Sequence, residues 1–118
     1  MKKLNVGVFV DSFRQGPVKG VEQAAVVGAD SFQVYVTKGE MAAEKMGAQA
    51  RKDFVAFYRK AGLTLSATCA DFGVNYGDAE KAPRGVELLR RAVDQAVDLE
   101  TRVITTHIGK LPKENVEA

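Results

Sequence analysis

The 118-residue sequence contains one cysteine, one histidine and no tryptophan. Cys69 has no second cysteine to pair with, which excludes an internal disulfide and is typical of a cytoplasmic protein. The net charge is only +2, and no run of Lys or Arg exceeds two residues. The sequence therefore lacks the basic surface that nucleic-acid or membrane binding needs. No apolar segment approaches the roughly 20 residues that span a bilayer.

Common nucleotide motifs are also missing. The glycines of Gly16–Gly20 follow the first apolar run without forming GxGxxG, and no GxxxxGK[ST] is present, so neither dinucleotide nor P-loop binding is supported. With a single histidine and no clustered carboxylates, a complete divalent-metal site cannot be assembled from this chain alone.

What the sequence does contain is one pattern repeated four times. Short runs rich in β-branched and aliphatic residues predict strands at Leu4–Val10, Phe32–Val36, Leu63–Thr68 and Val103–Thr106. Apolar residues at helical spacing lie between them, from about 18 to 28, 46 to 61 and 83 to 97. Gly62 is placed to end the second helix and Pro83 to begin the third. Strands and helices that alternate in this way indicate βαβ units and a parallel sheet, in the α/β class.

The predicted strands are apolar on one side only. Phe32, Val34 and Val36 alternate with polar or amphipathic neighbours. Leu4, Val6, Val8 and Val10 do the same in the first strand, and Leu63, Leu65 and Ala67 alternate with Thr64, Ser66 and Thr68 in the third. A doubly wound sheet would be apolar on both sides, whereas a barrel has helices outside and an interior that opens into an active-site mouth. The pattern favours a barrel.

The number of strands is half of what a barrel requires. A complete (β/α)8 barrel needs about 250 residues, whereas this sequence supplies four strands, about three helices and a tail, residues 113–118, that could begin a fourth helix. We therefore expect residues 1–118 to form a single domain that is the amino-terminal half of a TIM barrel, and the chain to be a truncated form of a longer protein.

Function in parallel α/β folds lies at the carboxyl ends of the strands. His107 follows the last predicted strand and is the candidate catalytic residue: its imidazole could bind a metal, a phosphate or a sugar hydroxyl, move a proton, or simply hydrogen-bond a neighbouring carbonyl. Alternation groups it with Val103 and Thr105, and if that face is the inner one, His107 points into the mouth beside Asp11, Thr37 and Thr68. Asp11 could act as an acid or base, or cap the following turn. The candidate substrate-binding residues at these ends are Asp11, Tyr35, Cys69, Asp71 and Thr106.

Three segments resemble a known family. NVGVFVDSF, GVEQAAVVGADSFQVYV and RVITTHIGKLP look like the amino-terminal half of the sugar phosphate isomerase/epimerase family, which has xylose isomerase-like barrels related to endonuclease IV. The resemblance implies that His107 matches a histidine ending the fourth strand, a metal ligand in the nuclease branch that lies near the substrate in sugar-active members. It also implies that Phe13 occupies a position where aromatic side chains line the sugar pocket.

The resemblance implies a reaction as well. Family members use a divalent metal, expected here to be Mn, Mg, Co or Zn, to move a proton next to a sugar carbonyl. The principal ligands of the family lie on strands five to eight and have no counterpart in this sequence. We therefore expect the longer protein to be a metal-dependent sugar or sugar-phosphate isomerase or epimerase, and the 118-residue chain to be inactive alone. A binding or assembly module without activity, and an endonuclease IV-like nuclease, are the alternatives.

A half barrel leaves its first and fourth strands as unpaired edges and exposes its inner face, including Phe9, Tyr35 and Val103. We expect either the missing carboxyl-terminal half-barrel or a second copy of the chain to cover this face. For the 118-residue chain itself, the sequence predicts a homodimer in which eight strands surround one core.

Overall fold

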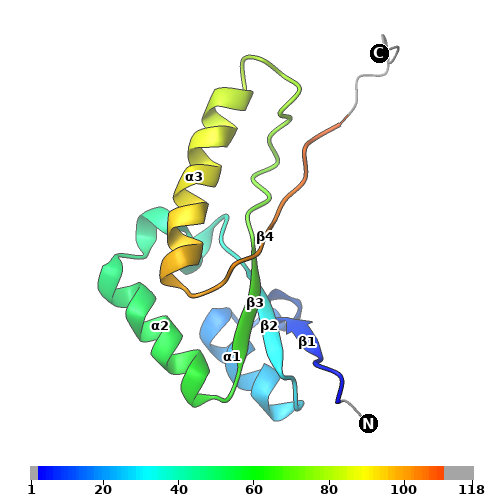
Figure 1. Ribbon diagram of the computed structural model, residues 1–118, viewed down its shortest axis with the longest axis vertical. Helices are drawn as coiled ribbons and strands as arrows, with labels where there is room; N and C mark the ends of the chain where they lie inside the picture. The colour runs from blue at the N-terminus through cyan, green and yellow to red at the C-terminus, as the bar shows by residue number, and fades with distance from the viewer. Residues whose placement is uncertain (1–2, 111–118) are drawn as a thin grey trace.

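A computed structural model describes residues 3–110 and contains one four-stranded parallel sheet (Figure 1). Its strands lie in the order β1-β2-β3-β4, with these bounds: β1 Gly7–Phe9, β2 Ser31–Tyr35, β3 Thr64–Cys69 and β4 Ile104–Thr105. Sequential order without crossing is what a barrel wall requires. The fold is therefore α/β with four parallel strands and three helices, as predicted.

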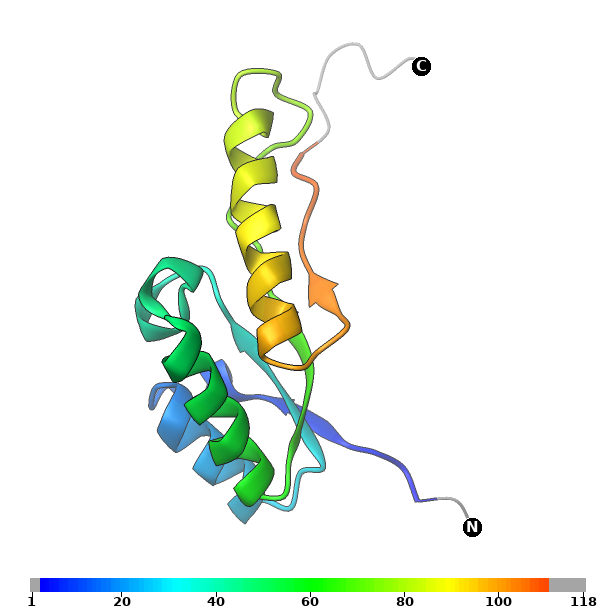
Figure 2. The ribbon, with the colours of Figure 1, turned by 60° about the vertical axis from the view of Figure 1, so that its left-hand side comes forward.

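The three helices all lie on one side of the sheet (Figures 1 and 2). They are α1 (Pro17–Val26), α2 (Ala48–Lys60) and α3 (Ala82–Asp98). Proline stands in the first turn of α1 and of α3, where a missing N–H leaves no helical bond unmade. Gly28 and Gly62 adopt positive φ just after α1 and α2, the conformation that ends a helix with least strain in glycine. None of these helices, within the part of the chain described, is long and apolar enough to cross a membrane.

The core fills the space between the sheet and the helices. Phe32 of β2 is fully buried and meets Phe54 and Tyr58 of α2 edge to face, with ring centroids 6.1 and 5.4 Å away. The Tyr58 hydroxyl donates a 2.8 Å hydrogen bond to the carbonyl oxygen of Leu99, just after α3. One buried ring system therefore joins β2, α2 and the end of α3.

The first strand is shorter than the predicted Leu4–Val10. Leu4 and Val6 were expected to face the helices, but they are 82% and 56% exposed. Figures 1 and 2 show the reason, because the chain before β1 leads away from the helices. The fourth strand is also shorter than Val103–Thr106, since only Ile104 and Thr105 pair with β3.

The predicted alternation fails in the third strand. Phe32 pairs with Leu65 but Gln33 pairs with Ala67, so Ser66 is an extra residue that bulges from the ladder. Its hydroxyl donates a 2.9 Å hydrogen bond to the Phe32 carbonyl oxygen. The bulge reverses the faces of the residues that follow. Thr68, predicted to face inward beside His107, instead pairs with the core residue Val34 and is fully buried.

The inner face and both edges of the sheet are open in residues 3–110. The rings of Phe9 and Tyr35 pack together on this face in a tilted arrangement, with centroids 4.8 Å apart. Tyr35 is 42% exposed and Val103 48%. Strands β1 and β4 each pair on one side only, as a half barrel requires.

Candidate functional site

The carboxyl ends of all four strands open onto the same end of the sheet. The 3-10 turn η1 (Val10–Phe13) follows β1, and two more, η2 (Gly39–Met41) and η3 (Ala43–Lys45), follow β2. The longer connection after β3, residues 70–81, lies beside the segment that follows β4. These connections carry the candidate residues, because parallel strands end at one edge of their sheet.

Asp71 and His107 form a hydrogen-bonded pair at this end. The Nδ1 atom of His107 lies 2.7 Å from Oδ2 of Asp71, and Oδ1 of Asp71 accepts a 3.1 Å hydrogen bond from the Gly73 N–H. The bond to His107, and next the Gly73 N–H, lower the pKa of the Asp71 carboxyl from its ordinary value. An ionised carboxylate only accepts hydrogen bonds, so Nδ1 carries the proton and Nε2 of a neutral ring has its lone pair available.

The two connections that carry this pair are locked together. The N–H of Tyr76 donates a 3.0 Å hydrogen bond to the Ile108 carbonyl oxygen. Gly109 has φ of +105° and packs so closely that a Cβ there would lie 2.6 Å from the Cα of Asn75. Only glycine fits both constraints, and the close approach holds Asp71 and His107 in position.

Two cavities lie at the strand ends, one at the Asp71–His107 pair and one at the ends of β1 and β2. A third, of about 430 Å³, lies on the outer side between α1 and α2. The cavity at the Asp71–His107 pair measures about 420 Å³ and is lined also by Asn75 and Lys110. The side chain of His107 is 83% exposed. Its ring can therefore reach a ligand in this cavity as well as Asp71.

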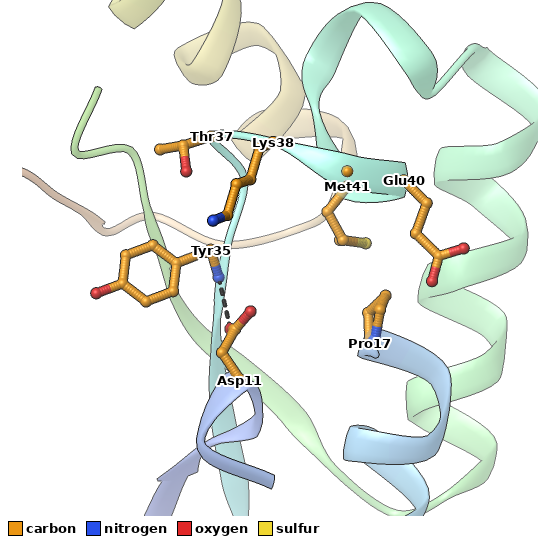
Figure 3. Close-up of a pocket in the computed structure, with 8 residues that line it drawn as sticks. Asp11, Pro17, Tyr35, Thr37, Lys38, Glu40 and Met41 are labelled. Atoms are coloured by element: carbon orange, nitrogen blue, oxygen red, sulfur yellow. Dashed lines mark hydrogen bonds between the residues drawn. The ribbon is translucent and has the colours of Figure 1, made fainter. Parts of the chain in front are cut away.

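A larger cavity of about 590 Å³ lies at the ends of β1 and β2 (Figure 3). Asp11, Tyr35 and Pro17 line one side, and Lys38, Glu40 and Met41 line the other. The Asp11 carboxylate accepts a 2.9 Å hydrogen bond from the backbone N–H of Tyr35. This bond ties the end of β1 to β2 and leaves the other carboxylate oxygen on the cavity side.

Cys69 lies on the inner face because of the bulge at Ser66. It pairs with Tyr35 in the sheet register and is 7% exposed. The nearby Cys69 thiol is the main cause of a raised pKa for the Tyr35 hydroxyl, with desolvation contributing next. The inner wall at this level is therefore an aromatic ring beside a thiol.

The remaining predicted residues lie further from these cavities. Phe13 is half-buried and packs against the hydrophobic core, and neither cavity at the strand ends includes it among its lining residues. The hydroxyl of Thr106 donates to the Ala70 carbonyl oxygen at 3.2 Å, which fastens the end of β4 to that of β3.

Sequence reasoning did not single out four further lining residues: Lys38, Glu40, Asn75 and Lys110. Each follows a predicted strand, so the sequence could have placed it near the strand ends. Polar residues in connections usually face solvent, however, and give no sign of lining a cavity. Which of them line a cavity depends on how the connections fold.

The described residues do not form a complete metal site. No group of three or more His, Cys, Asp or Glu side chains within residues 3–110 could hold an ion. The Asp71–His107 pair supplies two side chains of the types that ligate metals, and its imidazole is oriented by a carboxylate as in many metal sites. Any further ligands would have to come from outside this segment.

Comparisons with known proteins agree with the geometry. The family model described as xylose isomerase-like TIM barrel matches residues 21–118. A xylose isomerase domain protein from Planctomyces limnophilus is similar in structure, with a TM-score of 0.73 and 20% identity, over 93% of this chain and 43% of its own. Two sugar phosphate isomerase/epimerase structures from Parabacteroides distasonis have TM-scores of 0.64 and 0.60, with 16% and 12% identity. They are matched over 92% and 90% of this chain, and 41% and 42% of theirs.

No curated protein is a significant match. The chain spans less than half the length of the structures it resembles, consistent with half of a barrel. The match to the family model over most of the sequence, and the parallel sheet with helices on one side, show that this chain belongs to the xylose isomerase-like TIM barrel family.

Proposed function

We propose that this half barrel belongs to a metal-dependent sugar or sugar-phosphate isomerase or epimerase, which transfers a proton next to a sugar carbonyl. The observation that carries the proposal is the 2.7 Å contact between Asp71 and His107 at the carboxyl ends of adjacent strands. Family membership supports the barrel scaffold, and the names of the similar structures support this class of reaction.

In the proposed reaction His107 carries the proton. The lone pair on Nε2 takes a proton from the carbon beside the carbonyl, and the electron pair of the broken C–H bond moves toward the carbonyl oxygen. Delivery of the proton to the former carbonyl carbon, with transfer of the hydroxyl proton to the enediolate oxygen, forms the new carbonyl and gives an isomer. Delivery of a proton to the opposite face of the original carbon, by an acid on that side of the sugar, gives an epimer. Asp71 keeps the imidazole in the required tautomer and stabilises its protonated form.

A divalent ion, when bound, would supply Lewis-acid polarisation of the sugar carbonyl. His107 is the residue of this chain best suited to approach such an ion, since its Nδ1 is already oriented by a carboxylate. The same ring atom cannot ligate a metal and accept a proton at once. Metal ligand and proton carrier are therefore two distinguishable roles for Nε2.

The direct test is exchange of the carbon-bound proton with solvent. The longer protein that contains this half barrel is incubated in D₂O with Mn²⁺ or Co²⁺ and a panel of ketoses, aldoses and their phosphates, and deuterium beside the carbonyl is measured by NMR. We expect incorporation into at least one sugar, and a loss of at least about a hundredfold in His107→Ala, as for removal of a general base. No incorporation across the whole panel would reject the proposal.

A non-catalytic binding module is the second candidate, favoured by the incomplete metal site within residues 3–110. Thermal shift separates the two. Stabilisation by Mn²⁺ or Co²⁺ supports the enzyme, whereas stabilisation by a sugar without any metal supports the binding module. Cleavage of abasic DNA would instead support the nuclease, which the small net charge of +2 disfavours.

A further inference from the structure

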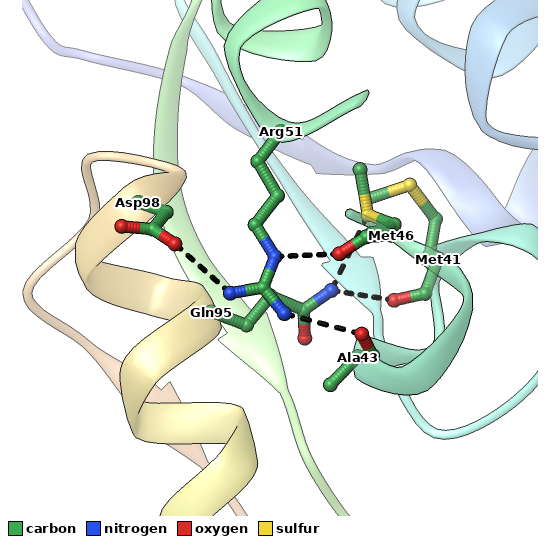
Figure 4. A network of polar contacts seen from close by, with 6 residues as sticks. All are labelled: Met41, Ala43, Met46, Arg51, Gln95 and Asp98. Atoms are coloured by element: carbon green, nitrogen blue, oxygen red, sulfur yellow. Dashed lines mark hydrogen bonds and ion pairs between the residues drawn. The ribbon is translucent and has the colours of Figure 1, made fainter. Parts of the chain in front are cut away.

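The segment that follows β2 is held by side chains from other elements. Residues 36–47 contain the turns η2 and η3, and the carbonyl oxygens of Met41, Ala43 and Met46 all accept side-chain hydrogen bonds. The donors are Gln95 of α3 and Arg51 of α2 (Figure 4). Lys38, Glu40 and Met41 of this same segment form one side of the 590 Å³ cavity. Its backbone position therefore determines the shape of the cavity.

Gln95 makes the most buried of these contacts. Its side chain is fully buried, and Nε2 donates to the Met41 carbonyl oxygen at 2.6 Å and lies 3.3 Å from the Met46 sulfur. The amide oxygen Oε1 is buried and has no hydrogen-bond partner in the described structure. Burying an amide whose oxygen has no hydrogen-bond partner reduces the free energy of unfolding, whereas a buried leucine or methionine carries no such cost. Packing alone therefore does not account for glutamine here, whereas the bond to Met41 does.

Arg51 joins the same segment to two helices. Its Nε donates to the Met46 carbonyl oxygen at 2.9 Å and Nη2 to that of Ala43 at 3.1 Å. Its Nη1 pairs with Asp98 at the end of α3, also at 2.9 Å. The arginine side chain is only 15% exposed. The planar guanidinium thus reaches three acceptors in fixed directions, which the single ammonium of lysine could not reproduce.

We propose that Gln95 and Arg51 are positioning residues, which hold residues 38–41 as a fixed wall of the 590 Å³ cavity. Neither side chain lines that cavity, so both act through the backbone of the segment they bind. The inference rests on the proposed function only in treating this cavity as part of the sugar site. The positional effect itself can be measured without any substrate.

The test is amide hydrogen exchange of the 118-residue chain, measured by NMR. The N–H groups of Ala42, Lys45 and Met46 make hydrogen bonds inside the segment. In Gln95→Leu we expect all three to exchange about tenfold faster or more, because the segment loses a buried hydrogen bond between two uncharged groups. The N–H of Thr68, bonded to Val103 in the sheet, should keep its rate.

Matched variants separate this role from general destabilisation. Gln49→Leu makes the same change on the exposed side of α2, where the amide donates to Asp53, and should leave the three rates unchanged. Equal acceleration at Thr68 and in the segment, or no acceleration in the segment, would overturn the proposal.

A second pair of variants covers the case in which Gln95→Leu does not fold. Arg51→Lys should accelerate exchange at Lys45 and Met46, whereas Arg59→Lys, an exposed arginine of the same helix paired with Glu100, should not. Unchanged rates in Arg51→Lys would overturn the proposal for Arg51. Neither result depends on an activity assay. The exchange rates can therefore be interpreted even if the proposed reaction is not found.

Discussion

His107 Nδ1 lies 2.7 Å from the Asp71 carboxylate, although 36 positions separate the two residues in the chain. The contact exists because β3 and β4 are neighbours in the sheet and each residue follows the end of its strand. It also lowers the pKa of Asp71 below the ordinary value of 3.8.

The first prediction concerns the pH dependence of this pair. A carboxyl whose pKa is lowered on folding contributes stability above its unfolded pKa and loses it as pH falls through the folded value. In His107→Ala the pKa of Asp71 should rise toward 3.8, so this carboxyl should contribute less stability above its unfolded pKa, and the part of the acid-dependent loss of stability that it causes should become smaller. Carboxyl ¹³C titration by NMR measures the shift. Asp30, whose pKa is lowered by the Val6 N–H and by Lys3, is the internal control and should not change.

The second prediction concerns Gly109. Gly109→Ala would place a Cβ 2.6 Å from the Cα of Asn75, in addition to the strain of its positive φ. Gly28→Ala carries similar strain at φ of +82° but has nothing within 4 Å. We expect about 1 kcal/mol of destabilisation for Gly28→Ala and a larger loss for Gly109→Ala, with separation of Asp71 from His107. Urea denaturation and the His107 ring signals measure both effects. Equal effects of the two substitutions would contradict this account of Gly109.

The third prediction concerns the buried hydroxyl of Tyr58. Tyr58→Phe removes the 2.8 Å hydrogen bond to Leu99 and leaves a buried carbonyl oxygen without that donor. The expected loss of stability is about 1–3 kcal/mol. Tyr76→Phe is the control, since its hydroxyl lies a long 3.5 Å from the Gly85 carbonyl oxygen and the residue is only partly buried. Thermal and urea denaturation should show a clear difference between the two.

The fourth prediction concerns self-association. Strands β1 and β4 each have one unpaired edge in the described sheet, and Tyr35 and Val103 are exposed on its inner face. We expect the 118-residue chain to form a homodimer in which β4 of each copy lies beside β1 of the other. Light scattering with the purified chain at micromolar concentration measures the mass. A folded monomer would contradict the prediction, and charged substitutions at Tyr35 and Val103 should dissociate a dimer.

The sequence predicts the fold well because its signals are local. Gly62 marked the end of α2 and Pro83 the start of α3, and apolar residues at helical spacing placed the other helix bounds within a few residues. The parallel sheet then follows from the alternation of strands and helices. Strand order needed no further information, because a barrel adds each strand beside the previous one.

The sequence does not predict the inner side of β3. Ser66 looks like an ordinary exposed strand residue, and the bulge there arises from how β3 pairs with β2, which no local pattern records. Asp71 and His107 were both identified from their positions after strands, but their contact depends on the tertiary arrangement. Likewise Gln95 appears in sequence as one polar residue of a helix, and its burial against Met41 requires the folded connection.

The bulge at Ser66 also determines what can be attached inside the barrel. It turns the only cysteine of the chain toward the inner face, beside Tyr35 and near the strand ends. A small thiol-directed label, such as a trifluoromethyl group observed by ¹⁹F NMR, therefore has one known position of attachment without any engineered cysteine, although the burial of Cys69 makes its attachment slow. Because Cys69 is nearly buried, its signal would be sensitive to closure of the barrel by a partner and to the arrival of a small molecule near Tyr35. The native sequence thus contains its own spectroscopic probe of the barrel interior.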